Sequence, residues 1–227
     1  MKSKYERALI IGAGDGLSAS VARLFAAEGM KIGLAARNTG KLDALAGELQ
    51  AAVYPCDVSQ PDQVDALFAA MDEKLGGSPD VVLFNPSARV RGPFAELDRE
   101  QVANALNVTA YGGFLVAQQF VRRALPNRHG AILFTGASAS VKGFAKSASF
   151  AMGKFAIRGL AQSLARELHP QGIHVAHFVI DGGIGRDSEG DSRLTPDAIA
   201  QTYLDILRQD RSVWSWEIEL RPWVESF

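Results

Sequence analysis

Glycines at positions 12, 14 and 16 separate a short apolar run, 8–11, from a stretch with apolar residues at helical spacing, 18–28. Glycine permits a tight turn and lets a diphosphate approach the backbone N–H groups at a helix N-terminus. A glycine-rich loop alone is weak evidence, but one that follows a predicted strand and opens a predicted helix has the required context. A turn without a ligand is the simpler alternative. We predict dinucleotide contacts at Gly12, Gly14, Asp15, Gly16 and Leu17.

The end of the second predicted strand, 31–36, bears on which dinucleotide is bound. Proteins that prefer NAD place a carboxylate here, where it binds the adenosine ribose hydroxyls. In this chain the strand ends at Ala36 and is followed by Arg37, whose guanidinium suits the 2′-phosphate of NADP. Asp15 favours the opposite choice, because its carboxylate would repel that phosphate. We expect NADP(H) as the cofactor, with NAD as the alternative.

Strand and helix patterns alternate along the chain, without a Ser/Pro-rich linker or a repeat. The predicted strands are 8–11, 31–36, 53–56, 81–84, 131–134, 173–180 and 216–220. The predicted helices are 18–28, 39–51, 59–75, 98–123, one within 144–168, and one from 195. This order favours an α/β fold with a doubly wound parallel sheet of about seven strands and helices on both faces. Residues 1–227 are expected to form one domain, with ligands at the C-terminal ends of the strands.

Composition excludes several other functions. Apolar residues make up 47% and charged residues 22% of the 227 residues, and the net charge is −1. No basic cluster suggests a nucleic-acid partner, and the single cysteine, Cys56, excludes a Cys-rich metal site. The N-terminus lacks the pattern of a signal peptide, and no apolar run approaches the roughly 20 residues of a membrane span. We expect a cytoplasmic protein with a small-molecule substrate and no metal.

The segment 149–154 (SFAMGK) resembles the Tyr-x-x-x-Lys site of short-chain dehydrogenases/reductases, with Phe150 in place of the tyrosine. The glycine spacing of the first loop also resembles that family, although Ser18 stands where a third glycine is usual. The resemblance extends from about Arg7 to about Pro222. The chain also resembles a subgroup of the family that has phenylalanine at the position of the tyrosine. It implies a Rossmann fold and an NAD(P)(H)-dependent oxidoreductase that transfers a hydride to or from a small substrate.

The resemblance also implies roles for other residues. The family's catalytic set is Asn, Ser, Tyr and Lys. Asn107 would help to hold a water beside Lys154, and Lys154 would bind the nicotinamide ribose hydroxyls. Ser138, with Ser140 as the second choice, would hydrogen-bond a substrate carbonyl. The further cofactor contacts implied by matching positions are Asp57, Val58, Asn85, Gly182 and Ile184.

The proton donor is the missing part of this set. A tyrosine titrates with a pKa of about 10, whereas a phenyl ring cannot titrate. Loss of a positioned general acid costs about 10²–10⁴ in rate. The family's wider spacing offers no replacement, because Ser147 stands seven residues before the lysine. Tyr111, one turn past Asn107, is a weak substitute, and packing is the default role for the four histidines.

Two functions therefore stay open. The first is an oxidoreductase that acts on a carbonyl, alcohol, activated alkene or imine, with a proton relayed by Ser138 or by water held at Lys154 and Asn107. The second is a catalytically silent NADP(H)-binding sensor or interaction protein, because the substitutions cluster at residues that perform chemistry.

An oligomer is a further expectation. The family often dimerises through its fourth and fifth long helices, so we expect a homodimer or tetramer. Close helix packing would use the small residues Gly112, Gly113, Ala117, Ala156, Gly159 and Ala161. The tail, 220–227, is predicted to dock on a partner subunit, and the polar loop 185–194 is predicted to be mobile.

Overall fold

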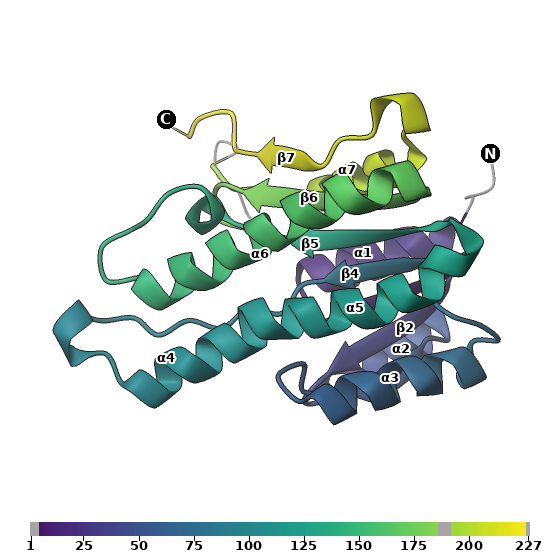
Figure 1. Cartoon of the computed structure of the whole chain (residues 1–227), viewed down its shortest axis with the longest axis horizontal. Coiled ribbons are helices and arrows are strands. Elements are labelled where there is room, and N and C mark those ends of the chain that lie inside the picture. Colours follow the sequence, from purple (N-terminus) through teal and green to yellow (C-terminus); the bar gives the residue numbers. More distant parts are fainter. Residues whose placement is uncertain (1–4, 186–191, 226–227) are drawn as a thin grey trace.

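Residues 5–185 and 192–225 are described by the structure, a computed structural model. Within them, one parallel sheet has the strand order β3-β2-β1-β4-β5-β6-β7 (Figure 1). The strands are β1 (Arg7–Ile11), β2 (Lys31–Ala36), β3 (Ala52–Pro55), β4 (Val81–Phe84), β5 (Gly130–Thr135), β6 (Ile173–Ile180) and β7 (Glu217–Leu220). The main helices are α1 (Leu17–Ala27), α2 (Asp43–Leu49), α3 (Pro61–Lys74), α4 (Arg99–Leu106), α5 (Gly112–Ala124), α6 (Ala148–Leu168) and α7 (Pro196–Arg208). The predicted doubly wound α/β fold is confirmed.

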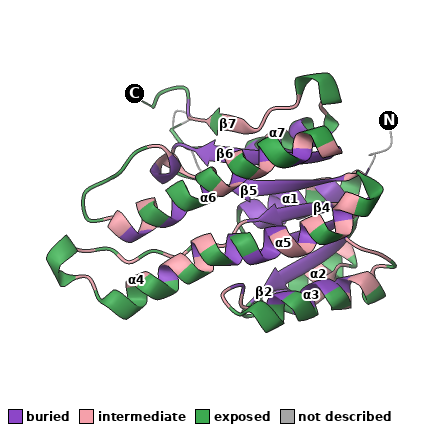
Figure 2. Cartoon of the chain, viewed as in Figure 1, coloured by how far each residue is buried: buried purple, intermediate pink, exposed green. Residues whose placement is uncertain are grey.

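Helices cover both faces of the sheet, which explains why its central strands are almost entirely buried (Figure 2). One core packs α1 and α7 against the sheet, and Phe178 stacks on Tyr203 there at 3.7 Å between ring centroids. The other core packs α3, α5 and α6 against the opposite face. In the described part of the chain, no helix is long and apolar enough to cross a membrane.

The order of the strands predicts a crevice at the C-terminal ends of the central strands β1 and β4. From β1 the chain runs outward through β2 to β3, and it then returns to β4 on the other side of β1. The segments that leave the C-terminal ends of β1 and β4 therefore diverge, and ligands of such sheets bind at this switch point.

The predicted long helix 98–123 is interrupted. Asp98 caps its start by accepting a hydrogen bond from the Gln101 backbone N–H at 2.8 Å. A π-helical segment, Asn107–Tyr111, then separates α4 from α5. Such segments are rare and are often found at functional sites. The candidate Asn107 begins this irregular turn and does not lie within a continuous α-helix.

Most of the small residues proposed for helix packing between subunits are buried inside this chain. A side chain at Gly112 would clash with Val58, and one at Gly113 would clash with Ile157. Ala117 and Ala161 are also buried. These residues let α5 and α6 approach their own sheet, so the expected open face is reduced to Ala156 and Gly159.

Candidate active site

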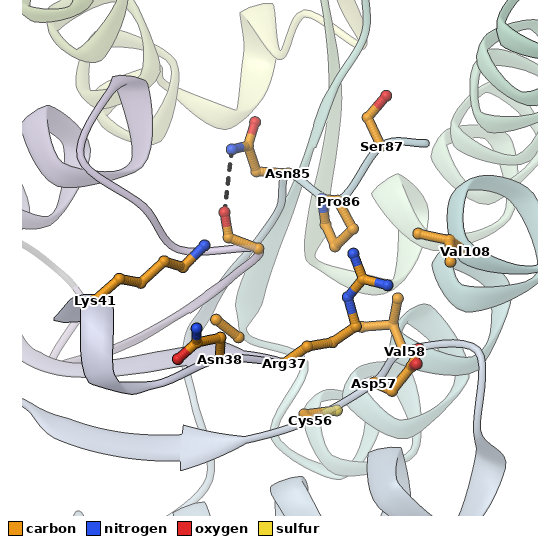
Figure 3. Close-up of a pocket in the computed structure, with 12 residues that line it drawn as sticks. Arg37, Asn38, Lys41, Cys56, Asp57, Val58, Asn85, Pro86, Ser87 and Val108 are labelled. Carbon is orange, nitrogen blue, oxygen red and sulfur yellow. Dashed lines mark hydrogen bonds between the residues drawn. The ribbon is translucent and has the colours of Figure 1, made fainter. Parts of the chain in front are cut away.

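A cleft of about 330 Å³ lies at the switch point of the sheet (Figure 3). Its lining includes five of the predicted cofactor residues: Gly12, Arg37, Asp57, Val58 and Asn85. It is extended by Asn38, Lys41, Pro86 and Ser87. Residues from four separate strand ends thus meet around one space, although they are up to 75 positions apart in the sequence.

The glycine loop is held in place by the end of β4. Asn85 donates a hydrogen bond to the Ser18 hydroxyl at 2.8 Å and another to the Gly12 carbonyl at 3.4 Å. Gly12 has φ +77°, and a Cβ there would lie 2.7 Å from the Pro86 nitrogen. Ser18, at the place of the family's third glycine, therefore has a structural role as the partner of Asn85.

Beyond this contact, the loop leaves open space at the N-terminus of α1. Nothing lies within 4 Å of a Cβ built at Gly16, and only the Lys41 ammonium, at 3.7 Å, lies near one built at Gly14. Backbone N–H groups at a helix start and a nearby cation suit a diphosphate. The residues present therefore fit a dinucleotide.

Two cations stand at the adenosine end of the cleft. Arg37 and Lys41 both extend into it in Figure 3, from the end of β2 and the turn after it. Asp15, which the sequence set against NADP, is exposed. Sequence reasoning missed Lys41. The available signal was a second basic residue four positions after Arg37, at the start of the next helical turn.

Lys154, on α6, is buried. Its ammonium donates a hydrogen bond to the Thr135 carbonyl at the end of β5, at 2.7 Å. Burial, together with the positive charge of Arg89, lowers the pKa of Lys154 to about 8. This side chain can therefore gain or lose a proton near neutral pH.

Phe150 borders a second pocket, of about 730 Å³. The Arg89 guanidinium carbon lies 4.0 Å from the centroid of the Phe150 ring, and the Lys154 ammonium lies 5.9 Å from it. Ser138 also lines this pocket, whereas its alternative, Ser140, is fully buried and bonds the Ala137 backbone N–H. The structure thus brings Ser138, Phe150 and Lys154 into one region, with Arg89 added.

Ser138 is engaged by a neighbouring carboxylate. Asp181, which stands directly after β6, interacts with the Ser138 hydroxyl, and this interaction lowers the pKa of the carboxyl. Asp181 also pairs with Lys142 at 3.3 Å and Arg221 at 2.7 Å. These contacts outweigh burial and keep the pKa of Asp181 below its usual value. Asp181 therefore competes with a substrate carbonyl for the Ser138 hydroxyl.

The remaining candidate residues are exposed at the surface. The Asn107 side chain is exposed, and Tyr111 is exposed with its ring stacked on Phe114 at 6.1 Å between centroids. Ile184 is 40% exposed and pairs with Leu194 in an isolated bridge. The bridge joins the two ends of the loop 185–194, which was predicted to be mobile and of which residues 186–191 lie outside the described residues.

The C-terminal tail packs partly on its own chain. Pro222 is buried, and it fills the space where a side chain at Gly182 would stand. The glycine at 182, with φ +158°, therefore fits the tail as well as a ligand. Trp223 is 80% exposed.

His177 was assigned to packing, but it lies close enough to Lys154 to feel its charge. It is fully buried on β6, with Nδ1 3.0 Å from a Glu217 oxygen. Arg158 on α6 donates two hydrogen bonds of 2.7 Å to the same carboxylate. Burial lowers the pKa of His177 to about 4 despite Glu217, so the imidazole is neutral at pH 7.

Comparison with known proteins agrees with this geometry. A family model described as enoyl-(acyl carrier protein) reductase matches residues 12–203. The 3-oxoacyl-[acyl-carrier-protein] reductase MabA of Mycobacterium tuberculosis is 29% identical over 79% of this chain and 69% of its own length. A short-chain dehydrogenase structure from Rhodopseudomonas palustris has a TM-score of 0.85 and 34% identity, with 96% of this chain and 99% of that chain covered.

A further structure supports the fold. A metagenomic short-chain oxidoreductase in complex with NADP has a TM-score of 0.84 at 24% identity, over 96% of this chain and 97% of that chain. Because the family model covers most of the sequence and the Rhodopseudomonas palustris short-chain dehydrogenase shares 34% identity over nearly its whole length, the chain belongs to the short-chain dehydrogenase/reductase family.

Proposed function

We propose that this protein is an NADP(H)-dependent oxidoreductase in which Lys154, with no phenol beside it, is the titrating group. The observation that carries the proposal is the buried Lys154 ammonium, which lies 5.9 Å from the Phe150 ring centroid and has its pKa lowered to about 8. The phenylalanine at position 150 supports assignment to a subgroup of the family that lacks the tyrosine. Relatives that reduce acyl-carrier-protein substrates or bind NADP support the cofactor and the reaction class.

The cofactor contacts follow from the cleft. Gly12 to Leu17 would receive the diphosphate, and Arg37 with Lys41 would receive the 2′-phosphate. Asp57 and Val58 would contact the adenine, and Lys154 the nicotinamide ribose. When bound, the nicotinamide supplies or accepts a hydride. NAD is the less favoured cofactor, because the cations at Arg37 and Lys41 would then lack a phosphate to pair with.

The proton route uses the chain's own groups. Ser138 is the less favoured donor, because Asp181 competes with the substrate for its hydroxyl. Lys154 can pass a proton to water, which Asn107 at the adjoining π-helical turn would help to hold. A carbonyl or alcohol reacts slowly by such a route, since a positioned general acid contributes about 10²–10⁴ in rate. An activated alkene or an imine needs less help and suits the site better.

A silent NADP(H)-binding protein is the second candidate. Two substitutions or contacts at the family's catalytic positions favour it, because Phe150 cannot titrate and Asp181 competes for the Ser138 hydroxyl. Both functions require NADPH binding, so binding alone does not separate them.

We also propose a homo-oligomer. Four large apolar side chains are between 43% and 50% exposed on and beside α5 and α6: Tyr111, Phe114, Met152 and Phe155. Burial of such a patch against a second copy would remove apolar surface from water. Sedimentation velocity of the wild type and of Phe114→Ser would test it.

The experiment begins with NADPH and NADH titrations of the wild type. A screen of ketones, activated alkenes and imines then follows in both redox directions, beside Lys154→Ala. Turnover that depends on Lys154 supports the oxidoreductase. A wild type that binds NADPH but converts nothing supports the silent binder, and a wild type that binds neither dinucleotide contradicts both.

A further inference from the structure

The pocket beside Phe150 carries an excess of positive charge. Three charged side chains line it, Arg89, Arg91 and Lys146, and all three are cations. Among residues 5–185 and 192–225, none of these three forms an ion pair. The nearby cations Lys142 and Arg221 differ, because Lys142 pairs with Asp181, and Arg221 pairs with both Asp181 and Glu219. The pocket thus offers positive charge that the described residues leave unmatched.

We propose that this pocket binds its substrate by an anionic oxygen group, a carboxylate or a phosphate, which Arg89 receives. The inference rests on the proposed function, since it names the substrate class of the same site. It gives Phe150 a purpose of its own.

Phe150 acts as a platform for Arg89. The guanidinium lies 4.0 Å from the ring centroid, a distance typical of a cation–π contact. A guanidinium that stacks through its face keeps its N–H edges available, and those edges match two acceptor oxygens of a carboxylate or phosphate. The phenyl ring therefore fixes the direction of the cation without consuming its hydrogen-bond donors.

The segment that carries Arg89 is tied to the start of α6 next to Phe150. The Ser149 hydroxyl donates to the Val90 carbonyl at 3.0 Å and accepts from the Val90 N–H at 2.8 Å. The Gly92 N–H donates to the Lys146 carbonyl at 3.2 Å. Lys146 adopts φ +59°, which is uncommon for a residue with a side chain. These bonds preorganise the cations, which lowers the cost of binding.

Anion binding would also act on the proton-transferring group. The charge of Arg89 is one of the two causes that lower the pKa of Lys154. An anion on Arg89 would offset that repulsion and raise the pKa again. Lys154 would then be protonated when the substrate is in place, and binding at pH 8 would take up a proton.

The test uses the full chain saturated with NADP⁺, so that Arg37 and Lys41 are covered. The probes are malonate, its neutral analogue malonamide, and inorganic phosphate, each titrated by calorimetry at pH 8 in two buffers of different ionisation enthalpy. The variants are Arg89→Gln and Phe150→Leu, with Arg122→Gln as the matched control, because Arg122 is an exposed arginine in the last turn of α5.

We expect malonate or phosphate to bind with proton uptake, and malonamide not to bind. Arg89→Gln should weaken the anion at least tenfold and Phe150→Leu severalfold, while Arg122→Gln leaves it unchanged. The tighter of the two anions identifies the group that the substrate carries. Equal affinity of wild type and Arg89→Gln, binding of malonamide as tight as malonate, or no anion binding at all would overturn the inference.

Failure of the proposed function is visible separately. If NADP⁺ does not bind, the anion titration is run without it, and Arg37→Gln is compared with Arg89→Gln. Loss of anion binding in Arg89→Gln alone would then uphold the inference while the cofactor assignment falls. Loss in Arg37→Gln alone would overturn it.

Discussion

The Arg89 guanidinium carbon lies 4.0 Å from the centroid of the Phe150 ring, and the Lys154 ammonium lies 5.9 Å from the same centroid. One aromatic ring therefore stands close to two cations. A phenyl ring tolerates them through its negative face. A phenol in its place would have its ionised form stabilised by both charges.

Phe150→Tyr should create a general acid in this chain. A tyrosine hydroxyl so placed has its pKa lowered by Arg89 and Lys154, which suits proton transfer near neutral pH. We expect NADPH-dependent reduction of simple ketones to rise by about 10²–10⁴ over the wild type. Initial rates with one aromatic and one aliphatic ketone would measure it.

The double variant Phe150→Tyr/Lys154→Ala is the control. It should lose most of the gain, because the phenol then lacks the buried ammonium. A Phe150→Tyr variant that binds NADPH normally yet shows no gain would mean that the engagement of Ser138 by Asp181, and not the missing phenol, limits carbonyl reduction.

Arg37→Gln and Lys41→Gln should each weaken NADPH more than NADH. Each substitution removes a cation from the adenosine end of the cleft, and a hydrogen bond to a charged group contributes about 1.5–3 kcal/mol. That corresponds to roughly a tenfold to hundredfold loss of affinity for NADPH. Fluorescence titration with both dinucleotides would measure the ratio.

The affinity for NADH should hardly change in either variant, because it lacks the 2′-phosphate. Asp15→Asn tests the opposing influence of the loop carboxylate, and we expect at most a small gain for NADPH since Asp15 is exposed. A large loss of NADH affinity in Arg37→Gln would show that the arginine contacts another part of the nucleotide.

The sequence predicted the elements that depend on local pattern. Short apolar runs predicted the strands, and the glycine loop predicted where the ligand cleft begins. Each of these patterns lies within a few consecutive residues, so it can be recognised from the sequence alone. The contacts of Phe150 could not be predicted from the sequence, because Arg89 lies 61 positions away on an exposed segment that has no helix or strand periodicity. The link from His177 to Glu217 and Arg158 depends on the register of β6 with β7 and on how α6 packs, neither of which periodicity reveals.

Lys154→Met should alter how stability depends on pH. The lysine pKa is 10.5 in the unfolded chain and about 8 in the folded chain. Between these values the unfolded state binds more protons, so the wild type gains stability as the pH rises from 8 to 10.5. The gain is about 3 kcal/mol, and the variant should lack it.

Urea unfolding of both proteins at pH 7.5 and pH 10 would measure the difference, with Lys146→Met as an exposed control that should follow the wild type. Parallel behaviour of the wild type and Lys154→Met would contradict a buried, easily deprotonated lysine. The measurement needs no cofactor or substrate, so it stands apart from the question of turnover.

His177→Gln should make the fold more resistant to acid. The histidine pKa is 6.5 in the unfolded chain and about 4 in the folded chain, because burial outweighs the attraction of Glu217. The unfolded state therefore binds more protons below pH 6.5, and the wild type loses about 2 kcal/mol between pH 7 and pH 5. A glutamine amide can still donate to Glu217 but does not titrate. The variant should therefore lose about 2 kcal/mol less unfolding free energy than the wild type between pH 7 and pH 5. Urea unfolding of both proteins at the two pH values would measure this difference. An equal loss in the two proteins would show that the pKa of His177 is the same in the folded and unfolded chains, and a smaller loss in the wild type would show that folded His177 is already protonated at pH 7 and paired with Glu217 as an ion.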